Sequence, residues 1–185
     1  KGLSLLNQGQ YLETIETLLK GKDFIFDNEL LISDFYSIIG DAYHKMENHL
    51  ESDQAYINAL KHNPENTLVL NNYSYYLSIR GDDLIKAEEM IIRCIQLTKE
   101  NPNASYIDTY AWVLYKLEKY DLALHQIELA LSLNPSSAVL LDHYGDILYK
   151  LGMKEQALNE WKKAFQLDSQ NIILETKINQ SILNE

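Results

Sequence analysis

Residues 104–137 read ASYIDTYAWVLYKLEKYDLALHQIELALSLNPSS, and residues 138–171 read AVLLDHYGDILYKLGMKEQALNEWKKAFQLDSQN. These two segments have the same length and align without a gap, and their matched positions are mostly small or apolar. Within each segment, apolar residues recur at the spacing of an α-helix in two runs that a short polar break separates. Each segment is therefore predicted to be a hairpin of two helices within a repeat array.

Earlier parts of the chain repeat the same pattern. Residues 33–66 match with Gly40 in the column of Ala111 and Gly145, and residues 67–103 match with about three extra residues. Because a single hairpin cannot bury its apolar face, consecutive copies are expected to stack and share a core. The sequence predicts four complete hairpins: 33–66, 67–103, 104–137 and 138–171.

Two further segments flank the four copies. Residues 1–32 resemble part of an earlier copy, and residues 172–185 carry Leu174, Ile178 and Ile182 at four-residue spacing, which predicts an amphipathic capping helix. The whole chain is thus predicted to be a single all-α solenoid domain of eleven helices without strands. Since it begins inside a helical pattern rather than with Met, we expect it to be a fragment of a longer protein.

Composition agrees with this fold and excludes several function classes. Only 3 Pro and 7 Gly occur in 185 residues, too few turn-forming residues for an all-β protein. The formal charge of −11 repels phosphate and anionic lipid, so we expect no nucleic-acid partner and no acidic membrane as partner. The longest stretch without a charge, residues 66–79, is too short for a membrane span, so no membrane insertion is expected. The single cysteine, Cys94, cannot form an internal disulfide.

Catalytic and metal-binding motifs are missing from the sequence. The five His residues form neither a HExxH motif nor a Cys/His cluster, and no nucleophile elbow, P-loop or dinucleotide-binding glycine pattern occurs. The sequence therefore predicts neither an enzyme nor a cofactor or metal site.

The repeat resembles a known family. Three of the four complete copies have Gly or Ala in the eighth column, three have Tyr before it, and the later copies have Ala in the twentieth and twenty-seventh columns. These features resemble the tetratricopeptide repeat. The local sequence is similar to that of repeat arrays in bacterial, often cell-envelope, proteins. The resemblance implies an α-α superhelix with first helices lining a concave groove. It suggests the bacterial envelope or periplasm as location, with the cytoplasm as the alternative.

The resemblance also assigns the second, fifth, ninth, twelfth and thirteenth columns to the groove. Family members that clamp a C-terminal carboxylate have Lys and Asn in the fifth and ninth columns. This chain lacks that combination, so the clamp is not expected. The candidate partner-binding residues are Asp41, Asn71, Tyr75, Asp108, Trp112, Tyr115, Lys116, Asp142, Asp146 and Tyr149.

Two interpretations of these residues stay open. Asp41 with Lys45, and Asp146 with Lys150, fit ordinary pairing along one helix face, whereas aromatic side chains such as Trp112 and Tyr75 fit contact with a ligand. A separate column of the second helices, which includes Trp161, is predicted to be core and not part of a site.

The sequence favours a non-enzymatic scaffold that binds an extended or helical segment of another protein in the groove. Acidic and aromatic groove columns predict a basic, partly aromatic partner segment. The alternative is a structural spacer or self-association module, whose groove is filled by its own longer chain or by a second copy.

Overall fold

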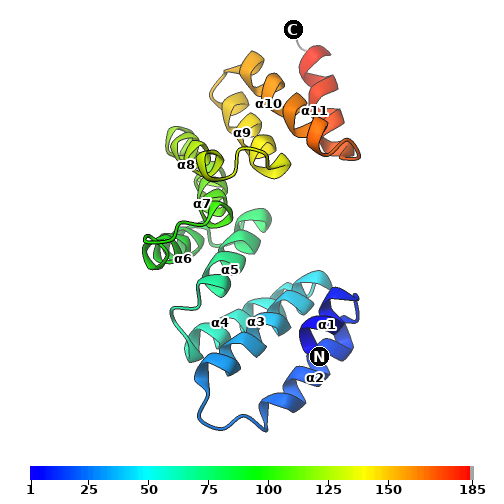
Figure 1. Ribbon diagram of the computed structural model, residues 1–185, viewed down its shortest axis with the longest axis vertical. Helices are drawn as coiled ribbons and strands as arrows, with labels where there is room; N and C mark the ends of the chain where they lie inside the picture. Colours follow the sequence, from blue (N-terminus) through cyan, green and yellow to red (C-terminus); the bar gives the residue numbers. More distant parts are fainter. Residues whose placement is uncertain (184–185) are drawn as a thin grey trace. The chain divides into compact units, whose positions relative to one another are not determined.

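The computed structural model describes residues 1–183, which form eleven α-helices and no strand, as predicted (Figure 1). The prediction for Asn184 and Glu185, the end of the capping segment, lies outside the described residues. The helices are α1 (Gly2–Asn7), α2 (Tyr11–Lys22), α3 (Glu29–Lys45), α4 (His49–His62), α5 (Thr67–Arg80), α6 (Leu84–Leu97), α7 (Ala104–Lys116), α8 (Tyr120–Leu133), α9 (Ala138–Lys150), α10 (Lys154–Leu167) and α11 (Ile172–Leu183).

Helices α5 to α10 follow the spacing of the repeat. The first helices α5, α7 and α9 begin at the first residue of their copies, and a three-residue turn separates each from its second helix. The extra residues of the second complete copy are divided between two places: α5 has 14 residues where α7 has 13, and the α6–α7 connection is longer than the α8–α9 connection.

Helix α3 departs from the repeat. It has 17 residues, against 13 in α7 and α9, and it begins at Glu29, one turn before the predicted copy starts at Ser33. The residues Asp23–Asn28 connect α2 to this extra turn. The repeat pattern did not predict the additional helical turn, because no other copy contains it.

Polar side chains fix the beginnings of several helices. The side chain of Asn28 accepts a hydrogen bond from the Leu31 amide, and that of Asp83 accepts one from the Lys86 amide. Ser137 caps α9 in the same way, through the Leu140 amide. These acceptors satisfy amides that have no partner within the helix, so each local sequence defines where its helix starts.

The contacts divide the chain into two compact units, Lys1–Tyr73 (unit 1) and Ser74–Glu185 (unit 2), with the boundary inside α5. The core of unit 1 contains Ile15, Leu18, Ile39, Ala42 and Ala55. Unit 2 has one cluster centred on α7 and α8, and a second in which Leu174 of α11 packs with α9 and α10. The apolar face of α11 thus joins the core of the last hairpin, as a capping helix is expected to do.

The second-helix column predicted as core is buried throughout. Its members are at most 4% exposed, and they are Leu18, Tyr56, Ile91, Ile127 and Trp161. Two of the five are aromatic, and each lies over a glycine of the preceding helix: Tyr56 over Gly40, and Trp161 over Gly145. A side chain at either glycine would overlap the aromatic ring, so glycine permits the close approach.

Two further properties bear on function. Within residues 1–183, no helix is both long and apolar enough to cross a membrane. Cys94 is fully buried in α6, and burial raises the pKa of its thiol to about 12, so it is a neutral packing residue.

Candidate functional site

The predicted groove residues fall in both units. Asp41 and Asn71 belong to unit 1, and the other eight belong to unit 2. In unit 1, Asp41 accepts hydrogen bonds from Tyr56 and Asn72, and the Asn71 side chain donates to Asn72. These two residues are therefore part of a hydrogen-bond network between helices. In unit 2, α7 and α9 bring most of the other predicted residues together.

An aromatic stack connects α7 to α9. The Trp112 ring lies 4.8 Å from the Tyr115 ring and 4.3 Å from the His143 ring, nearly parallel to both. The ammonium of Lys116 lies 5.4 Å from the Trp112 ring centroid, within the range of a cation–π interaction. Trp112 is thus half-buried and contacts the neighbouring repeat, which leaves less of its surface for a partner than the sequence suggested.

Asp108 and His143, a member of the stack, form a hydrogen-bonded pair. Asp108 Oδ1 is 2.7 Å from His143 Nδ1, and both side chains are nearly buried. Burial lowers the pKa of His143, but the hydrogen bond to Asp108 and the charges of the nearby aspartates outweigh it, so the pKa is raised overall. Asp108 therefore holds the imidazole in place against Trp112.

Two carboxylates of α9 share one ammonium from α11. Lys177 Nζ is 2.6 Å from Asp142 Oδ1 and 2.7 Å from Asp146 Oδ1. The same ammonium lies 5.8 Å from the centroid of the Trp161 ring. The capping helix thus supplies the cation for two of the predicted acidic residues.

Trp161 connects this ion pair to the core. Its indole nitrogen donates to Asp146 Oδ1 at 3.1 Å and to the Asp142 carbonyl at 3.3 Å. Burial raises the pKa of Asp146, although the charge of Lys177 acts in the opposite direction. The carboxylate is therefore held in a partly desolvated position, where its charge interacts more strongly than it would in water.

A pocket of about 280 Å³ opens beside these residues. Three aromatic side chains contribute to its walls, from α7, α9 and α10, and the Asp146–Lys177 pair contributes charge. Burial and the nearby Asp146 charge raise the pKa of Tyr115 to about 12, so its phenol stays protonated at neutral pH and can donate a hydrogen bond. The lining residues are Tyr115, Asp146, Tyr149, Lys150, Trp161, Lys177 and Gln180.

Tyr75 is the predicted groove residue of unit 2 that lies on α5. Its ring is tilted against Tyr76 at 5.9 Å between centroids. Burial, followed by the negative charge of Asp108, raises the pKa of Tyr75. Tyr75 is therefore half-buried near the Asp108–His143 pair, and it is not among the residues that line the pocket.

Five residues of this site were not among the predicted ones: His143, Lys150, Trp161, Lys177 and Gln180. His143 lies in a column that the repeat pattern does not assign to the groove, and Lys177 lies on the capping helix outside the repeats. Trp161 was assigned to the core only, yet it also lines the pocket because one edge of its ring faces Asp146. The sequence signal for Lys177 is weak: it is the sixth residue of the segment 172–185, next to the fifth column, which the resemblance assigns to the groove.

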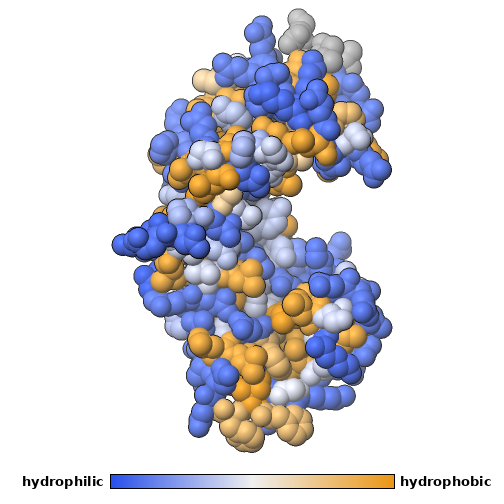
Figure 2. Space-filling model, in the orientation of Figure 1, coloured by the Kyte–Doolittle hydropathy of each residue, from blue (hydrophilic) through white to orange (hydrophobic). Residues whose placement is uncertain are grey.

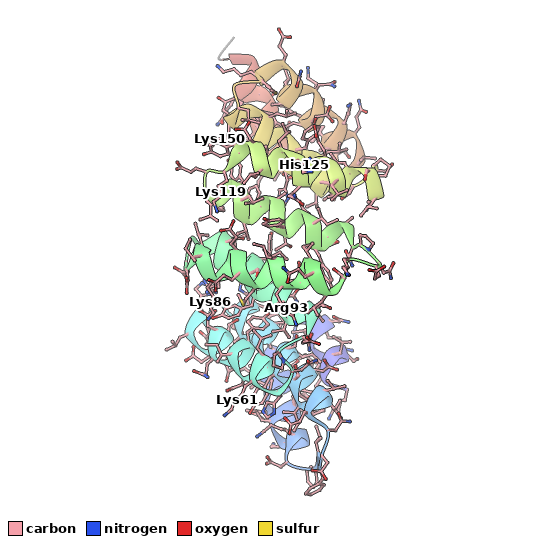
Figure 3. The ribbon with its side chains drawn as sticks, turned by 90° about the vertical axis from the view of Figure 1, so that its left-hand side faces the viewer. Lys61, Lys86, Arg93, Lys119, His125 and Lys150 are labelled. Atoms are coloured by element: carbon pink, nitrogen blue, oxygen red, sulfur yellow. The ribbon has the colours of Figure 1, made fainter. Side chains whose placement is uncertain are left out.

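Several basic side chains of unit 2 lie outside the pocket. Figure 3 shows Lys86 and Arg93 on α6 and His125 on α8, all on second helices. None of these three lines the pocket. The part of the chain that the structure describes contains no group of three or more His, Cys, Asp or Glu residues that could hold a metal ion.

The hairpin repeat, the buried small-residue columns and the capping helix are the features of one repeat family. The family model for the tetratricopeptide repeat matches residues 2–170. The chain belongs to the tetratricopeptide-repeat family. Tetratricopeptide repeats generally serve as scaffolds for protein–protein interaction. No curated protein matches the chain.

Solved structures show the same fold at low sequence identity. A chain in the structure of the APC/C hetero-tetramer Cut9–Hcn1 is 14% identical to this chain with a TM-score of 0.84. The match covers 97% of this chain and 34% of the other. PilF from Pseudomonas aeruginosa is 20% identical with a TM-score of 0.79, over 99% and 86%. PilW, a type IV pilus biogenesis factor, is 14% identical with a TM-score of 0.84, over 99% and 83%. The chain therefore spans about a third of the chain matched in the Cut9–Hcn1 structure and most of the PilF and PilW chains.

Proposed function

We propose that this tetratricopeptide-repeat chain is a non-enzymatic scaffold, and that unit 2 binds a basic, partly aromatic segment of another protein. The observation that carries the proposal is the pocket between α7, α9, α10 and α11, because it combines aromatic walls with a partly buried carboxylate. Such a pocket suits one aromatic or cationic side chain of a partner, which serves as the anchor of a larger interface.

Tyr149 is the residue best placed to contact the anchor. It is 38% exposed, and its ring lies 5.6 Å from the Trp161 ring. A lysine, arginine or tyrosine side chain that enters the pocket would bury the Tyr149 face, and stacking of a cation on an aromatic ring contributes about 0.5–2 kcal/mol. Trp112 has a supporting role in this proposal, because its faces are occupied by Tyr115 and His143.

Net charge supports a basic partner. Residues 74–185 carry eleven Lys or Arg and sixteen Asp or Glu, which gives a formal charge of −5. A negative unit attracts a positive segment from a distance, so association should slow as salt is added and the screening length shortens to about 8 Å at physiological ionic strength. The dissociation rate should depend mainly on the contacts inside the pocket.

The test is binding of a fluorescein-labelled nonapeptide of alternating lysine and tyrosine, measured by fluorescence anisotropy. Tyr149→Ala should weaken binding about 10- to 100-fold, which corresponds to about 1.4–2.8 kcal/mol, mainly through faster dissociation. Met153→Ala is a matched control, because Met153 is 42% exposed and lies outside this pocket. It should leave the affinity unchanged.

Two results would contradict the proposal. One is equal binding of a nonapeptide of alternating glutamate and tyrosine, because the net negative charge of unit 2 should repel it. The other is unchanged affinity in Tyr149→Ala at a melting temperature equal to that of the wild type. Either result would remove the pocket as the anchor site.

The alternative function, a module whose groove is filled by its own chain, also has an observation in its favour. Lys177 of α11 already contacts both Asp142 and Asp146, as an internal basic segment would. This alternative predicts that Lys177→Gln creates binding of the lysine–tyrosine peptide where the wild type shows none. The scaffold proposal predicts measurable binding in both proteins.

A further inference from the structure

The connection between α2 and α3 exposes an unusual amount of apolar surface. Figure 2 shows hydrophobic residues gathered over this connection, which Figure 1 places between the ends of α2 and α3. Phe24 is 80% exposed and Phe26 is 84% exposed. Leu30 and Leu31, in the first turn of α3, are 62% and 38% exposed. We call these four residues the Phe patch.

The Phe patch lies in the segment where unit 1 departs from the repeat. The extra first turn of α3 has no counterpart in α7 or α9, and the six-residue connection before it is as long as the α6–α7 connection and longer than the α4–α5 and α8–α9 connections. Stacking of hairpins does not need these residues, since their side chains are largely outside the core. Insertions into a helical repeat lie on its surface and often form the binding face.

The patch is held in a defined position by its surroundings. Asn28 caps α3 through the Leu31 amide, and the amides of Phe24 and Ile25 donate to carbonyls at the end of α2. The Glu29 carboxylate contacts His62 at the end of α4, 2.5 Å from its Nδ1. A patch fixed in this way loses little conformational freedom on binding, which favours affinity.

Charge selects the kind of partner that covers the patch. Residues 1–73 carry five lysines, no arginine and eleven aspartates or glutamates, a formal charge of −6. Asp23 and Asp27 flank the two phenylalanines, and Asp34 is exposed on α3. Two copies of the patch would bring these carboxylates together, and an anionic bilayer would repel them, whereas a basic partner would pair with them.

From the exposed aromatic residues, the insertion and the charge, we infer that the Phe patch is a second docking surface, which binds a partner segment with an apolar stripe flanked by lysine or arginine. Phe24 and Phe26 are the anchors, because a buried aromatic side chain contributes about 150–250 Å² of contact. The surface lies wholly within unit 1 and is independent of the pocket proposed in unit 2.

The test uses the full chain and a labelled 18-residue peptide of leucine and lysine, with leucine at helical spacing. The wild type should bind it. The affinity of the double variant Phe24→Ser/Phe26→Ser should be lower by a factor of at least about 30, the change expected for the loss of a hot spot of about 2 kcal/mol. Leu30→Ser should also weaken binding. Because the substituted side chains are exposed, the melting temperature should stay within about 2 °C of the wild type.

Two control variants locate the effect. Leu50 is 80% exposed on the first turn of α4, at the opposite end of that helix from His62. Leu50→Ala should therefore change the affinity less than about threefold, the limit for a near-neutral contact. Tyr149→Ala should also leave it unchanged, so a failure of this inference is distinguishable from a failure of the proposed function.

Several outcomes would overturn the inference. These are no binding of the leucine–lysine peptide, equal binding of a leucine–glutamate peptide, or equal losses in Leu50→Ala and the double phenylalanine variant. Binding to phosphatidylglycerol vesicles that the double variant abolishes would assign the patch to a membrane surface instead. A dimer in light scattering that the same variant dissociates would assign it to a second copy of this chain.

Discussion

Asp41 in unit 1 and Asp146 in unit 2 occupy the same column of the repeat, yet their surroundings differ. In both hairpins the carboxylate accepts a hydrogen bond from a buried aromatic side chain, the Tyr56 hydroxyl in one and the Trp161 indole in the other. Asp41 also accepts from the Asn72 amide, a neutral group. Asp146 instead pairs with the Lys177 ammonium, beside a pocket.

The comparison shows that one repeat column can serve two purposes. The position of the carboxylate comes from the shared packing of an aromatic ring over a glycine. The second group that contacts the carboxylate determines its electrostatic role. The Asn72 amide connects Asp41 to the following helix α5, whereas an ammonium on the capping helix makes Asp146 part of an ionic site.

The largest effect is expected at the glycines. A methyl group at Gly145 would lie 2.4 Å from the Trp161 ring, and one at Gly40 would lie 2.9 Å from the Tyr56 ring. Gly145→Ala should therefore lower the free energy of unfolding by about 3 kcal/mol, and Gly40→Ala by about half as much, as is typical of overpacking. Urea denaturation followed by circular dichroism measures both values.

A double-mutant cycle identifies the cause. The third complete copy pairs Ala111 with Ile127 at these positions, and both are fully buried. In a Trp161→Ile background, Gly145→Ala should accordingly be neutral or stabilising by up to about 1 kcal/mol, the ordinary helix preference for Ala over Gly. A loss as large as in the wild-type background would show that the ring is not the obstacle.

An intermediate effect is expected where the two units differ. Lys177→Gln should lower the free energy of unfolding by about 1–3 kcal/mol, between the values for exposed and buried ion pairs, because its partners are mostly buried. The loss should shrink at acidic pH, where protonation removes the unpaired charge of Asp146. Lys162→Gln, an exposed lysine on α10, should change stability by less than about 0.5 kcal/mol. Equal losses in the two variants would refute an ionic role for Lys177.

The smallest effect concerns pH. The folded-state pKa of His143 is raised above its ordinary value of 6.5. Its contribution to stability is therefore fully present below about pH 6.5 and is lost as the pH rises through the folded-state pKa. The free energy of unfolding, measured from pH 6 to pH 8, should decrease more in the wild type than in His143→Gln. Parallel pH profiles would contradict the pairing with Asp108.

The fold could be predicted because the repeat pattern occurs several times in the sequence. Each copy places small and apolar residues at the same helical positions, so an ambiguous position in one copy is clear in another, and the predicted all-α solenoid was confirmed. The extra turn of α3 was not predictable in this way. It occurs once, and its exposed Leu30 and Leu31 do not follow the core periodicity of the other first helices.

The site was predicted only in part, because the repeat pattern assigns faces but not contacts between copies. Asp146 and Tyr149 were found through their columns. Their neighbours Lys177 and Trp161 come from a capping helix and from a core column, and a long side chain in either position can reach the groove edge without any change in the pattern. The stacking of Trp112 on His143 likewise depends on the spacing of two helices, which the sequence does not specify.

The most direct measurement uses the only two tryptophans in the chain, Trp112 and Trp161, which give two indole N–H signals in a ¹⁵N–¹H spectrum. In a titration of the full chain with the lysine–tyrosine nonapeptide, the Trp161 signal should shift to saturation, because its indole donates to Asp146 at the edge of the pocket. The shift should be lost in Tyr149→Ala and retained in Phe24→Ser/Phe26→Ser. Saturable binding of the peptide with both indole signals unmoved would contradict the assignment of the pocket as the partner-binding site.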